Sequence, residues 1–256
     1  YKDRLNCNDM PLPLWKEGEL DNKPPFQMHD YLYGGQNGAT ESIIGLTEDD
    51  KRERFRDYYA MIELIDDQLG RLIDYIEAKG LRENTLIIFH SDHGEMNGDH
   101  GLYWKGPYFY EALVHVPLIF SCPGVIKSGI ISNALVELVD IAPTILELAG
   151  LEVPCYMQGK SIAPILTGKA DPSFHKEAVY CEYYRSMKDC HEVDATMYFD
   201  GRFKLVVYHG CDYGELYDLV KDPNEYDNMW DNVEYRSVKF ELIKRSFEHA
   251  ILCNRD

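Results

Sequence analysis

The longest periodic pattern of hydrophobic residues lies between Thr47 and Gly80. Apolar side chains recur there every three or four positions, which is typical of one face of an amphipathic helix. Thr47, with Asp49 and Asp50 behind it, is typical of a helix N-terminus, because the hydroxyl caps free amides and the carboxylates favour the positive end of the helix dipole. Gly80 is suited to ending the helix. We therefore predict a helix from about Thr47 to Gly80.

A continuous apolar run at residues 85–89 follows this helix. Its length and its β-branched residues favour a strand buried on both faces. Residues 117–121 predict a second strand, and residues 140–149 a helix that tolerates proline in its first turn. Residues 1–45 are rich in Pro, Gly, Asn and Asp with little periodicity, so we predict an irregular segment laid over a larger body.

The pattern changes after about residue 173. Short alternating or aromatic runs occupy residues 178–184, 195–199 and 203–208. Asp200-Gly201 stands between the last two runs and is a strong hairpin signal. A further strand at 216–219 and a terminal amphipathic helix at 233–253 complete the pattern. The fold class that we predict is α/β: residues 1–172 form part of an α/β core, and residues 173–256 form a smaller subdomain with an antiparallel sheet and a terminal helix.

Aromatic side chains are frequent in the predicted subdomain. We interpret them as core or inter-domain packing, with the lining of a substrate pocket as the alternative. They are Tyr180, Tyr183, Tyr184, Tyr198 and Phe199.

Candidate ligands gather where the strand at 85–89 stops. Ligands bind at the carboxyl ends of strands in open α/β sheets, and Asp92 and His93 stand at such an end. An extended chain would point these neighbours to opposite faces, but a turn opened by Gly94 could bring both onto one metal ion. Lys105 follows after a glycine-containing loop. A divalent metal beside a lysine is suited to a tetrahedral oxyanion such as sulfate or phosphate.

Each of these residues also has a structural interpretation. Asp92 could cap a helical turn, His93 could be a hydrogen-bonded core histidine, and Lys105 alone would be a solvated lysine. The combination favours a site. We consider His100 either a proton donor to the leaving group or a residue that fastens its loop. His90, on the strand itself, is interpreted as a buried partner of the metal site rather than a ligand.

Composition narrows the classes of partner. The chain has 256 residues, 45% of them hydrophobic, which suffices for a substantial core. Its 26 basic and 44 acidic residues give a net charge of −18, which argues against nucleic acid and anionic membranes as partners. There is no run of 18 apolar residues, so no membrane span is expected. Seven irregularly spaced cysteines without C-x-x-C slightly favour a cytoplasmic location over a periplasmic or secreted one.

Three motifs resemble the sulfatases of the alkaline-phosphatase-like superfamily. They are S-D-H-G-E-x-x-G-D-H-G with W-K-G at 91–106, V-D-x-x-P-T-x-L-x-L-A-G at 139–150, and E-L-Y-D-L…D-P-x-E…N at 215–228. With the segment at 110–119, the resemblance covers roughly residues 55–230 in the family's order. It implies that Asp92 and His93 bind a divalent metal, usually Ca²⁺, and that Lys105 contacts the sulfate or the leaving oxygen.

The family's nucleophile motif, C/S-x-P/A-x-R, has no counterpart in the chain. Cys122 is followed by Pro-Gly, Cys181 has Arg185 at the right distance but Tyr183 where Pro or Ala should stand, and Ser161 lacks the arginine. The family's first pair of metal-binding aspartates is also missing. The resemblance therefore implies the C-terminal portion of a longer enzyme. Formylglycine is expected in the missing N-terminal part, without which the 256 residues should be inactive.

These observations favour a metal-dependent sulfuric ester hydrolase that acts on a small sulfated substrate. Aryl sulfates, choline sulfate and sulfated sugars all remain open. The alternatives are a phosphate or phosphonate ester hydrolase of the same superfamily and, if the chain is complete, a non-catalytic module. A zinc site of the metallo-β-lactamase type would need a histidine two residues before His90, where Ile88 stands.

Overall fold

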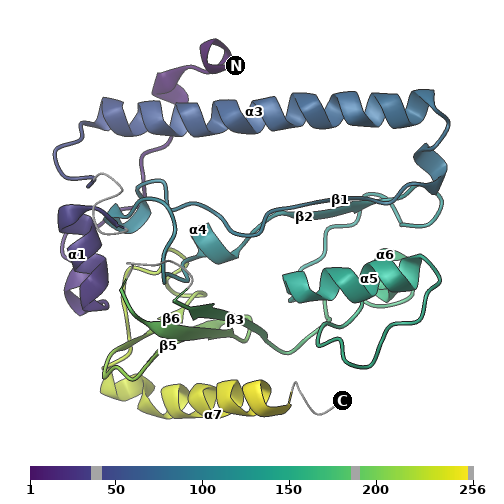
Figure 1. Ribbon diagram of the computed structural model, residues 1–256. Coiled ribbons are helices and arrows are strands. Elements are labelled where there is room, and N and C mark those ends of the chain that lie inside the picture. The colour runs from purple at the N-terminus through teal and green to yellow at the C-terminus, as the bar shows by residue number, and fades with distance from the viewer. Residues whose placement is uncertain (36–41, 186–190, 253–256) are drawn as a thin grey trace.

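The computed structural model describes residues 1–35, 42–185 and 191–252. The long helix α3 crosses one end of the molecule, a two-stranded sheet lies in the middle, and a four-stranded sheet with helix α7 beneath it forms the other end (Figure 1). The strands are β1 (Ile87–His90), β2 (Leu118–Ser121), β3 (Val179–Tyr184), β4 (Asp194–Phe199), β5 (Phe203–His209) and β6 (Gly214–Asp218). The helices are α1 (Pro25–Tyr33), α3 (Glu48–Ala78), α4 (Glu111–Val114), α5 (Ile141–Leu148), α6 (Ala163–Leu166) and α7 (Arg236–Leu252).

The predicted limits of the long helix are confirmed. Thr47 caps α3 by accepting a hydrogen bond from the Asp50 amide at 3.2 Å, and the Asp50 carboxylate accepts one from the Thr47 amide at 2.9 Å. This reciprocal capping box satisfies two free amides at the helix start. The apolar stripe, however, does not face a core: no residue of α3 is buried, and Ile65 is 53% exposed. The helix contacts short turns at Lys2–Arg4, Cys7–Asp9 and Arg82–Asn84.

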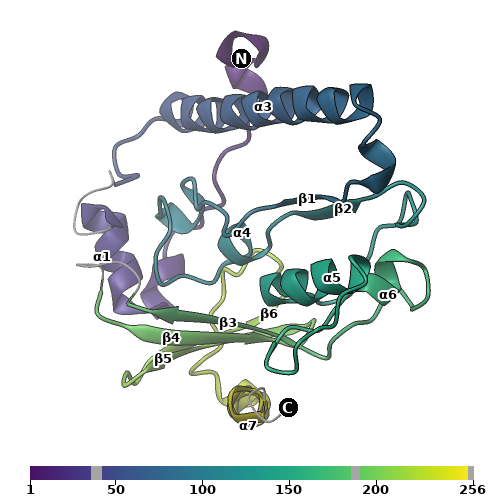
Figure 2. The ribbon, with the colours of Figure 1, turned by 45° about the vertical axis from the view of Figure 1, so that its right-hand side comes forward.

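Strand β1 pairs antiparallel with β2, with Phe89 opposite Ile119. The prediction of a strand buried on both faces is wrong for the described residues, because the side chains of β1 are only half-buried or exposed. Within the described ranges this sheet has two strands, so each strand has a hydrogen-bonded neighbour on one edge and none on the other. Ile119 is accordingly 58% exposed. Figure 2 shows both strands lying between α3 and α5.

The four strands of the second sheet run in the order β3-β4-β5-β6, and each pair is antiparallel. The predicted hairpin joins β4 to β5. Asp200 accepts hydrogen bonds from the amides of Arg202 at 3.0 Å and Phe203 at 2.8 Å, and Gly201 has φ 91°, which a residue without a Cβ adopts at little cost. The strand predicted at 216–219 is present as β6.

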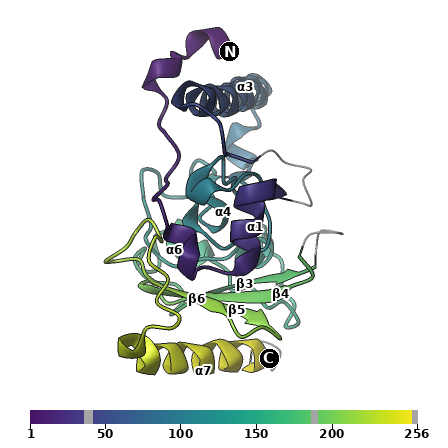
Figure 3. The same ribbon diagram turned by 90° about the vertical axis from the view of Figure 1, so that its left-hand side faces the viewer.

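Both faces of this sheet are buried, and alternate residues divide between them. Met197 and Val206 face a cluster with Tyr108 and Tyr110, whereas Leu205 on the opposite face packs with Leu242 of α7. Figure 3 shows α1 and α4 on one side of the sheet and α7 on the other. The antiparallel sheet is therefore the part of the chain with the most complete core.

Two helical predictions need correction. Helix α1 lies in the segment that was predicted to be irregular. The sequence did not mark its start clearly, because Pro25 stands at the first position but no side chain caps the helix. It is stabilised by tertiary contacts: Phe26, Gln27 and Asp30 are buried. The terminal helix α7 is only weakly amphipathic, since Phe247 is 68% exposed although Leu242 is buried.

A buried lysine connects the sheet to the segment that precedes α4. Lys204 on β5 donates to the carbonyl of Phe109 at 2.9 Å and forms ion pairs with Glu111 at 2.7 Å and Glu225 at 2.8 Å. Glu225 also accepts a hydrogen bond from the Glu111 amide at 2.7 Å. The three partners of Lys204 compensate for the burial of its ammonium group. These contacts fix the position of α4.

Two global expectations concern membranes and disulfides. Among the described residues, no helix has the length and apolarity needed to cross a membrane. The cysteines that the structure describes carry free thiols; they are Cys7, Cys122, Cys155, Cys181 and Cys211. The subdomain boundary at 172/173 stays a prediction.

Candidate active site

Asp92 and His93 lie side by side immediately after β1. Nε2 of His93 is 3.8 Å from Oδ2 of Asp92, and the His93 amide donates to Oδ1 of Asp92 at 3.0 Å. Nδ1 of His93 lies 2.8 Å from the carbonyl oxygen of Gly94, so this nitrogen carries the proton and donates it to the carbonyl. The lone pair of Nε2 is thereby directed to the same side as the carboxylate, which is the arrangement that a metal ligand pair requires.

Gly94 allows this turn because its backbone lies against α4. Its amide donates to the carbonyl of Leu113 at 2.8 Å, and the next amide, of Glu95, donates to that of Ala112 at 3.1 Å. A Cβ on Gly94 would lie 1.8 Å from the Ala112 oxygen, far inside van der Waals contact. The glycine therefore lets the chain approach α4 closely enough to place Asp92 and His93 together.

We expect Gly94→Ala to cost about 2 kcal/mol or more of unfolding free energy, because backbone would have to move to relieve the clash. Metal affinity should fall with it, since the same turn orients His93. Urea unfolding and metal titration of the variant measure both effects. Gly70→Ala in α3, where nothing lies within 4 Å of the new Cβ, is the matched control and should be neutral or stabilising. Equal stability of the two variants would contradict the role of Gly94.

Lys105 is exposed and lines the same open cavity as Asp92 and His93, a cavity of about 3020 Å³. The pKa of the Asp92 carboxyl is lowered mainly by the backbone hydrogen bond from His93, and the charge of Lys105 lowers it further. Asp92 is therefore ionised at neutral pH, and a cation faces it from the loop. All three predicted residues line this cavity.

His100 does not line that cavity. His100 is 2% exposed, its Nδ1 lies 2.6 Å from Oε2 of Glu19, and its ring stacks on Tyr110 at 4.0 Å between centroids. Its amide donates to the carbonyl of Leu14 at 2.7 Å, and its φ of 54° is in the left-handed region. These contacts favour the role of fastening the loop to the N-terminal segment over that of a proton donor.

His90 also differs from its interpretation as a buried partner of the metal site. Its side chain is exposed, and Nδ1 lies 3.4 Å from the carbonyl of the adjacent Ser91. His90 is the last residue of β1, where the two-stranded sheet offers little cover.

Burial acts to raise the pKa of the Glu19 carboxyl, but the hydrogen bond from His100 and the charge of Lys23 outweigh it, so that this pKa lies below its ordinary value of 4.5. A carboxyl with a lowered folded-state pKa contributes stability above its unfolded pKa and loses it as pH falls through the folded pKa. We therefore expect the free energy of unfolding to fall below about pH 4.5 with a slope that Glu19→Gln reduces.

Urea unfolding between about pH 3 and pH 5 measures this slope. Glu248→Gln, which removes an exposed carboxylate paired with Lys244 at 3.7 Å, should leave the slope unchanged. An unchanged slope in Glu19→Gln would show that the pairing of Glu19 does not control acid stability.

His115 was missed as a candidate residue in the sequence. Its side chain is 79% exposed, lines the cavity, and has Nδ1 2.9 Å from Oε2 of Glu111. Burial acts to raise the pKa of Glu111, but the charge of Lys204 outweighs it, and the pKa is lowered. The sequence signal was present, because His115 falls in the segment 110–119 that resembles the family. Four of the five predicted aromatic residues line the cavity and also belong to, or pack against, the hydrophobic clusters of the sheet, so the packing interpretation holds for them as well as the pocket-lining alternative; they are Tyr180, Tyr183, Tyr198 and Phe199.

Asp92 and His93 together fit a divalent metal ion. A metal bound about 2.0–2.6 Å from each donor atom spans their separation of 3.8 Å. Asp92 supplies a hard anionic oxygen and His93 an imidazole nitrogen whose other nitrogen is already held. Two donors are part of a coordination set, so further ligands would complete it.

Two family models match the chain. The C-terminal model of N-sulphoglucosamine sulphohydrolase covers residues 98–250, and the sulfatase model covers residues 25–151. An N-acetylglucosamine-6-O-sulfatase of Bacteroides thetaiotaomicron is 36% identical over 196 residues, which are 75% of this chain and 35% of that protein. Human arylsulfatase K is 33% identical over 257 residues, or 98% of this chain and 44% of that protein. The chain thus spans less than half the length of these relatives.

The chain is also similar to several solved structures. The phosphonate monoester hydrolase of Agrobacterium radiobacter superposes with a TM-score of 0.85 at 27% identity, covering 98% of this chain and 53% of that one. A protein bound to its substrate D-glucosamine-2-N,6-O-disulfate superposes with a TM-score of 0.73 at 31% identity, covering 82% of this chain and 42% of that one. The predicted fold class, an alkaline-phosphatase-like α/β fold with an antiparallel sheet, is confirmed. From its motifs, its fold and these matches, the chain belongs to the sulfatase family.

Proposed function

We propose that the protein containing this chain hydrolyses sulfate monoesters with the help of a divalent metal ion. The observation that carries the proposal is that Asp92, His93 and Lys105 line the same open cavity, where the charge of Lys105 acts on Asp92. A metal ion held by Asp92 and His93 would, together with the Lys105 ammonium, offer positive charge to a tetrahedral anion. Family membership makes sulfate the leading anion, since the sulfatase family implies a divalent metal and a formylglycine in general.

Each residue has a separate role in this proposal. Asp92 binds the metal through its carboxylate, and His93 binds it through Nε2. Lys105 stabilises the negative charge that develops on the leaving oxygen as the ester bond breaks. His100 acts as a positioning residue through its contact with Glu19. Formylglycine supplies the nucleophile in this family, and we place it outside the 256 residues because no motif for it occurs in them.

We propose Ca²⁺ as the metal. Its flexible coordination by six to eight oxygen ligands suits an exposed aspartate that can bind through one or both oxygens. His93 is the less typical ligand for a hard cation, so metal analysis of the purified protein is the direct check.

The substrate that we propose is small and sulfated. A net charge of −18 opposes binding of a long polyanion. The relatives carry the names N-acetylglucosamine-6-O-sulfatase, arylsulfatase K and choline-sulfatase, so sulfated amino sugars, aryl sulfates and choline sulfate are the candidates.

Phosphonate monoester hydrolysis is the second candidate function. It is favoured by the TM-score of 0.85 with a phosphonate monoester hydrolase. Phosphonate and sulfate monoesters present similar tetrahedral oxyanions to the same metal and lysine, so one site could serve both.

The test is a comparison of kcat/KM for the full encoded protein on matched esters. An aryl sulfate and an aryl phosphonate with the same leaving group should be compared first, followed by choline sulfate and a 6-O-sulfated glucosamine. We expect at least one sulfate ester to give the highest kcat/KM. A higher value for the aryl phosphonate would favour the second candidate, and no turnover of any ester would contradict both.

A further inference from the structure

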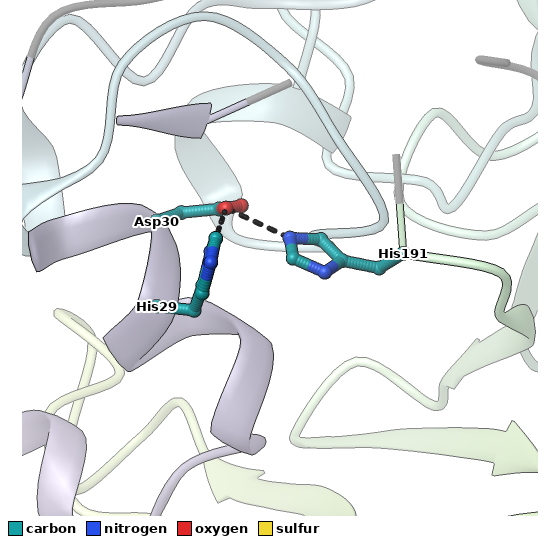
Figure 4. Close-up of side chains that lie close together, drawn as sticks. All are labelled: His29, Asp30 and His191. Carbon is teal, nitrogen blue, oxygen red and sulfur yellow. Dashed lines mark hydrogen bonds and ion pairs between the residues drawn. The ribbon is translucent and has the colours of Figure 1, made fainter. Parts of the chain in front are cut away.

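His29, Asp30 and His191 lie together where α1 meets the segment that leads into β4 (Figure 4). Nε2 of His191 is 2.7 Å from Oδ1 of Asp30, and Nδ1 of His29 is 3.4 Å from the same oxygen. One potential ligand atom from each residue lies within 4.8 Å of the other two. Both imidazole rings approach the carboxylate from different sides in Figure 4. None of the three residues lines the cavity that holds Asp92 and His93.

We propose that this cluster is a second metal site, selective for a transition metal ion such as Zn²⁺. Two imidazole nitrogens and one carboxylate oxygen form a typical three-ligand zinc set, with a fourth position left for water. Tetrahedral bonds of about 2.0–2.1 Å place ligand atoms about 3.3 Å apart. His29 and Asp30 meet this requirement at 3.4 Å. His191 would retreat from Asp30 by roughly 0.6 Å to do so.

The surroundings of Asp30 support metal binding. The hydroxyl of Tyr108 donates to Oδ2 of Asp30, which leaves Oδ1 facing the two histidines. Metal-binding carboxylates are commonly held by such a hydrogen bond to the second oxygen. The Asp30 side chain is 2% exposed, so a divalent cation would compensate a buried negative charge.

The two histidines differ in their access to solvent. The His29 side chain is 48% exposed, which gives an ion and its water a path to the site. The ring of His191 lies 5.1 Å from that of Phe26, so an apolar neighbour limits its rotation. A ligand set of one fixed and one accessible imidazole can bind and release an ion without opening the core.

The rival interpretation is a hydrogen-bonded trio that holds no metal. It explains the contact between His191 and Asp30, and the ring of His29 also packs on Tyr33 at 5.0 Å between centroids, but the 3.4 Å from Nδ1 of His29 to Asp30 is longer than an ordinary N–H···O hydrogen bond. A metal ion would be coordinated by both His29 and His191. It would also connect residues 161 positions apart in the chain and so stabilise the contact between α1 and the sheet.

Titration of the full encoded protein with Co²⁺, after removal of bound metal by a chelator, tests the proposal. We expect one equivalent to give the intense visible absorption of four-coordinate Co²⁺, and Zn²⁺ to displace it. His29→Ala should abolish this absorption and weaken Zn²⁺ binding by at least about 100-fold, while Tyr108→Phe should weaken it by about 10–100-fold. Zn²⁺ should raise the Tm of the unsubstituted protein and not that of His29→Ala.

Two controls separate this site from other imidazoles and from the proposed catalytic metal. His115→Ala removes an exposed histidine that is paired with a carboxylate, as His29 is, and should retain the absorption. Asp92→Ala should also retain it. Because His29 is largely at the surface, its variant is expected to fold, which circular dichroism checks. Binding of Zn²⁺ by His29→Ala with unchanged affinity, or no four-coordinate Co²⁺ in the unsubstituted protein, would overturn the proposal.

Discussion

Asp92→Ala is expected to abolish hydrolysis and to lower the metal content of the full encoded protein. Asp92 is the anionic member of the pair with His93, and a hard divalent cation depends on carboxylate charge for its binding. The alanine variant leaves His93 as a single neutral donor. Loss of a metal ligand removes both the charge that neutralises the sulfate oxygens and the orientation of the ester, so the expected effect on kcat is the largest of all.

Metal analysis and steady-state kinetics of the same preparation measure this prediction. Asp66→Ala, which removes an exposed carboxylate on α3, is the control for a general loss of negative charge. The control should retain both activity and metal. Unchanged metal stoichiometry and turnover in Asp92→Ala would remove Asp92 from the site.

Lys105→Ala is expected to reduce kcat by about 10²–10³-fold, the range seen when one group that stabilises developing charge is lost. The lysine ammonium should interact more strongly with the transition state than with the ground state, because negative charge builds on the bridging oxygen as the ester bond breaks. The reduction should therefore depend on the leaving group. Esters with very acidic leaving groups need little assistance and should lose the least.

A series of aryl sulfates with leaving groups of different pKa measures this dependence. Lys244→Ala, which removes an exposed lysine of α7, is the control and should leave kcat unchanged. Equal losses of kcat for good and poor leaving groups, together with a lowered Tm, would identify Lys105 as a structural residue instead.

Local chemistry made several elements predictable. The start of α3 follows from the reciprocal bonds of Thr47 and Asp50, and the hairpin between β4 and β5 follows from Asp200 and Gly201. These features depend on residues that are neighbours in the sequence. The pairing of Asp92 with His93 was predictable for the same reason, since His93 bonds to its neighbours Asp92 and Gly94.

Features that depend on distant contacts could not be predicted in this way. The burial of β1 depends on which strands flank it, and the stability of α1 depends on packing of Phe26 with Tyr108 and Tyr208 rather than on a cap. The position of His100 was left open because its partner, Glu19, lies 81 residues earlier in the chain. No local pattern marks such a pair.

The buried contacts of Lys204 and Glu225 have a consequence for biosynthesis. Glu225, which holds the start of α4, lies 114 positions after Glu111. During translation, Asp92, His93 and Gly94 are added long before Glu225, whose carboxylate holds α4 in place against this turn. The turn at Gly94 is therefore expected to mature late, after β5 and the Glu225 segment have emerged. A nascent chain that stops before Lys204 would expose an unsupported turn to proteases and chaperones.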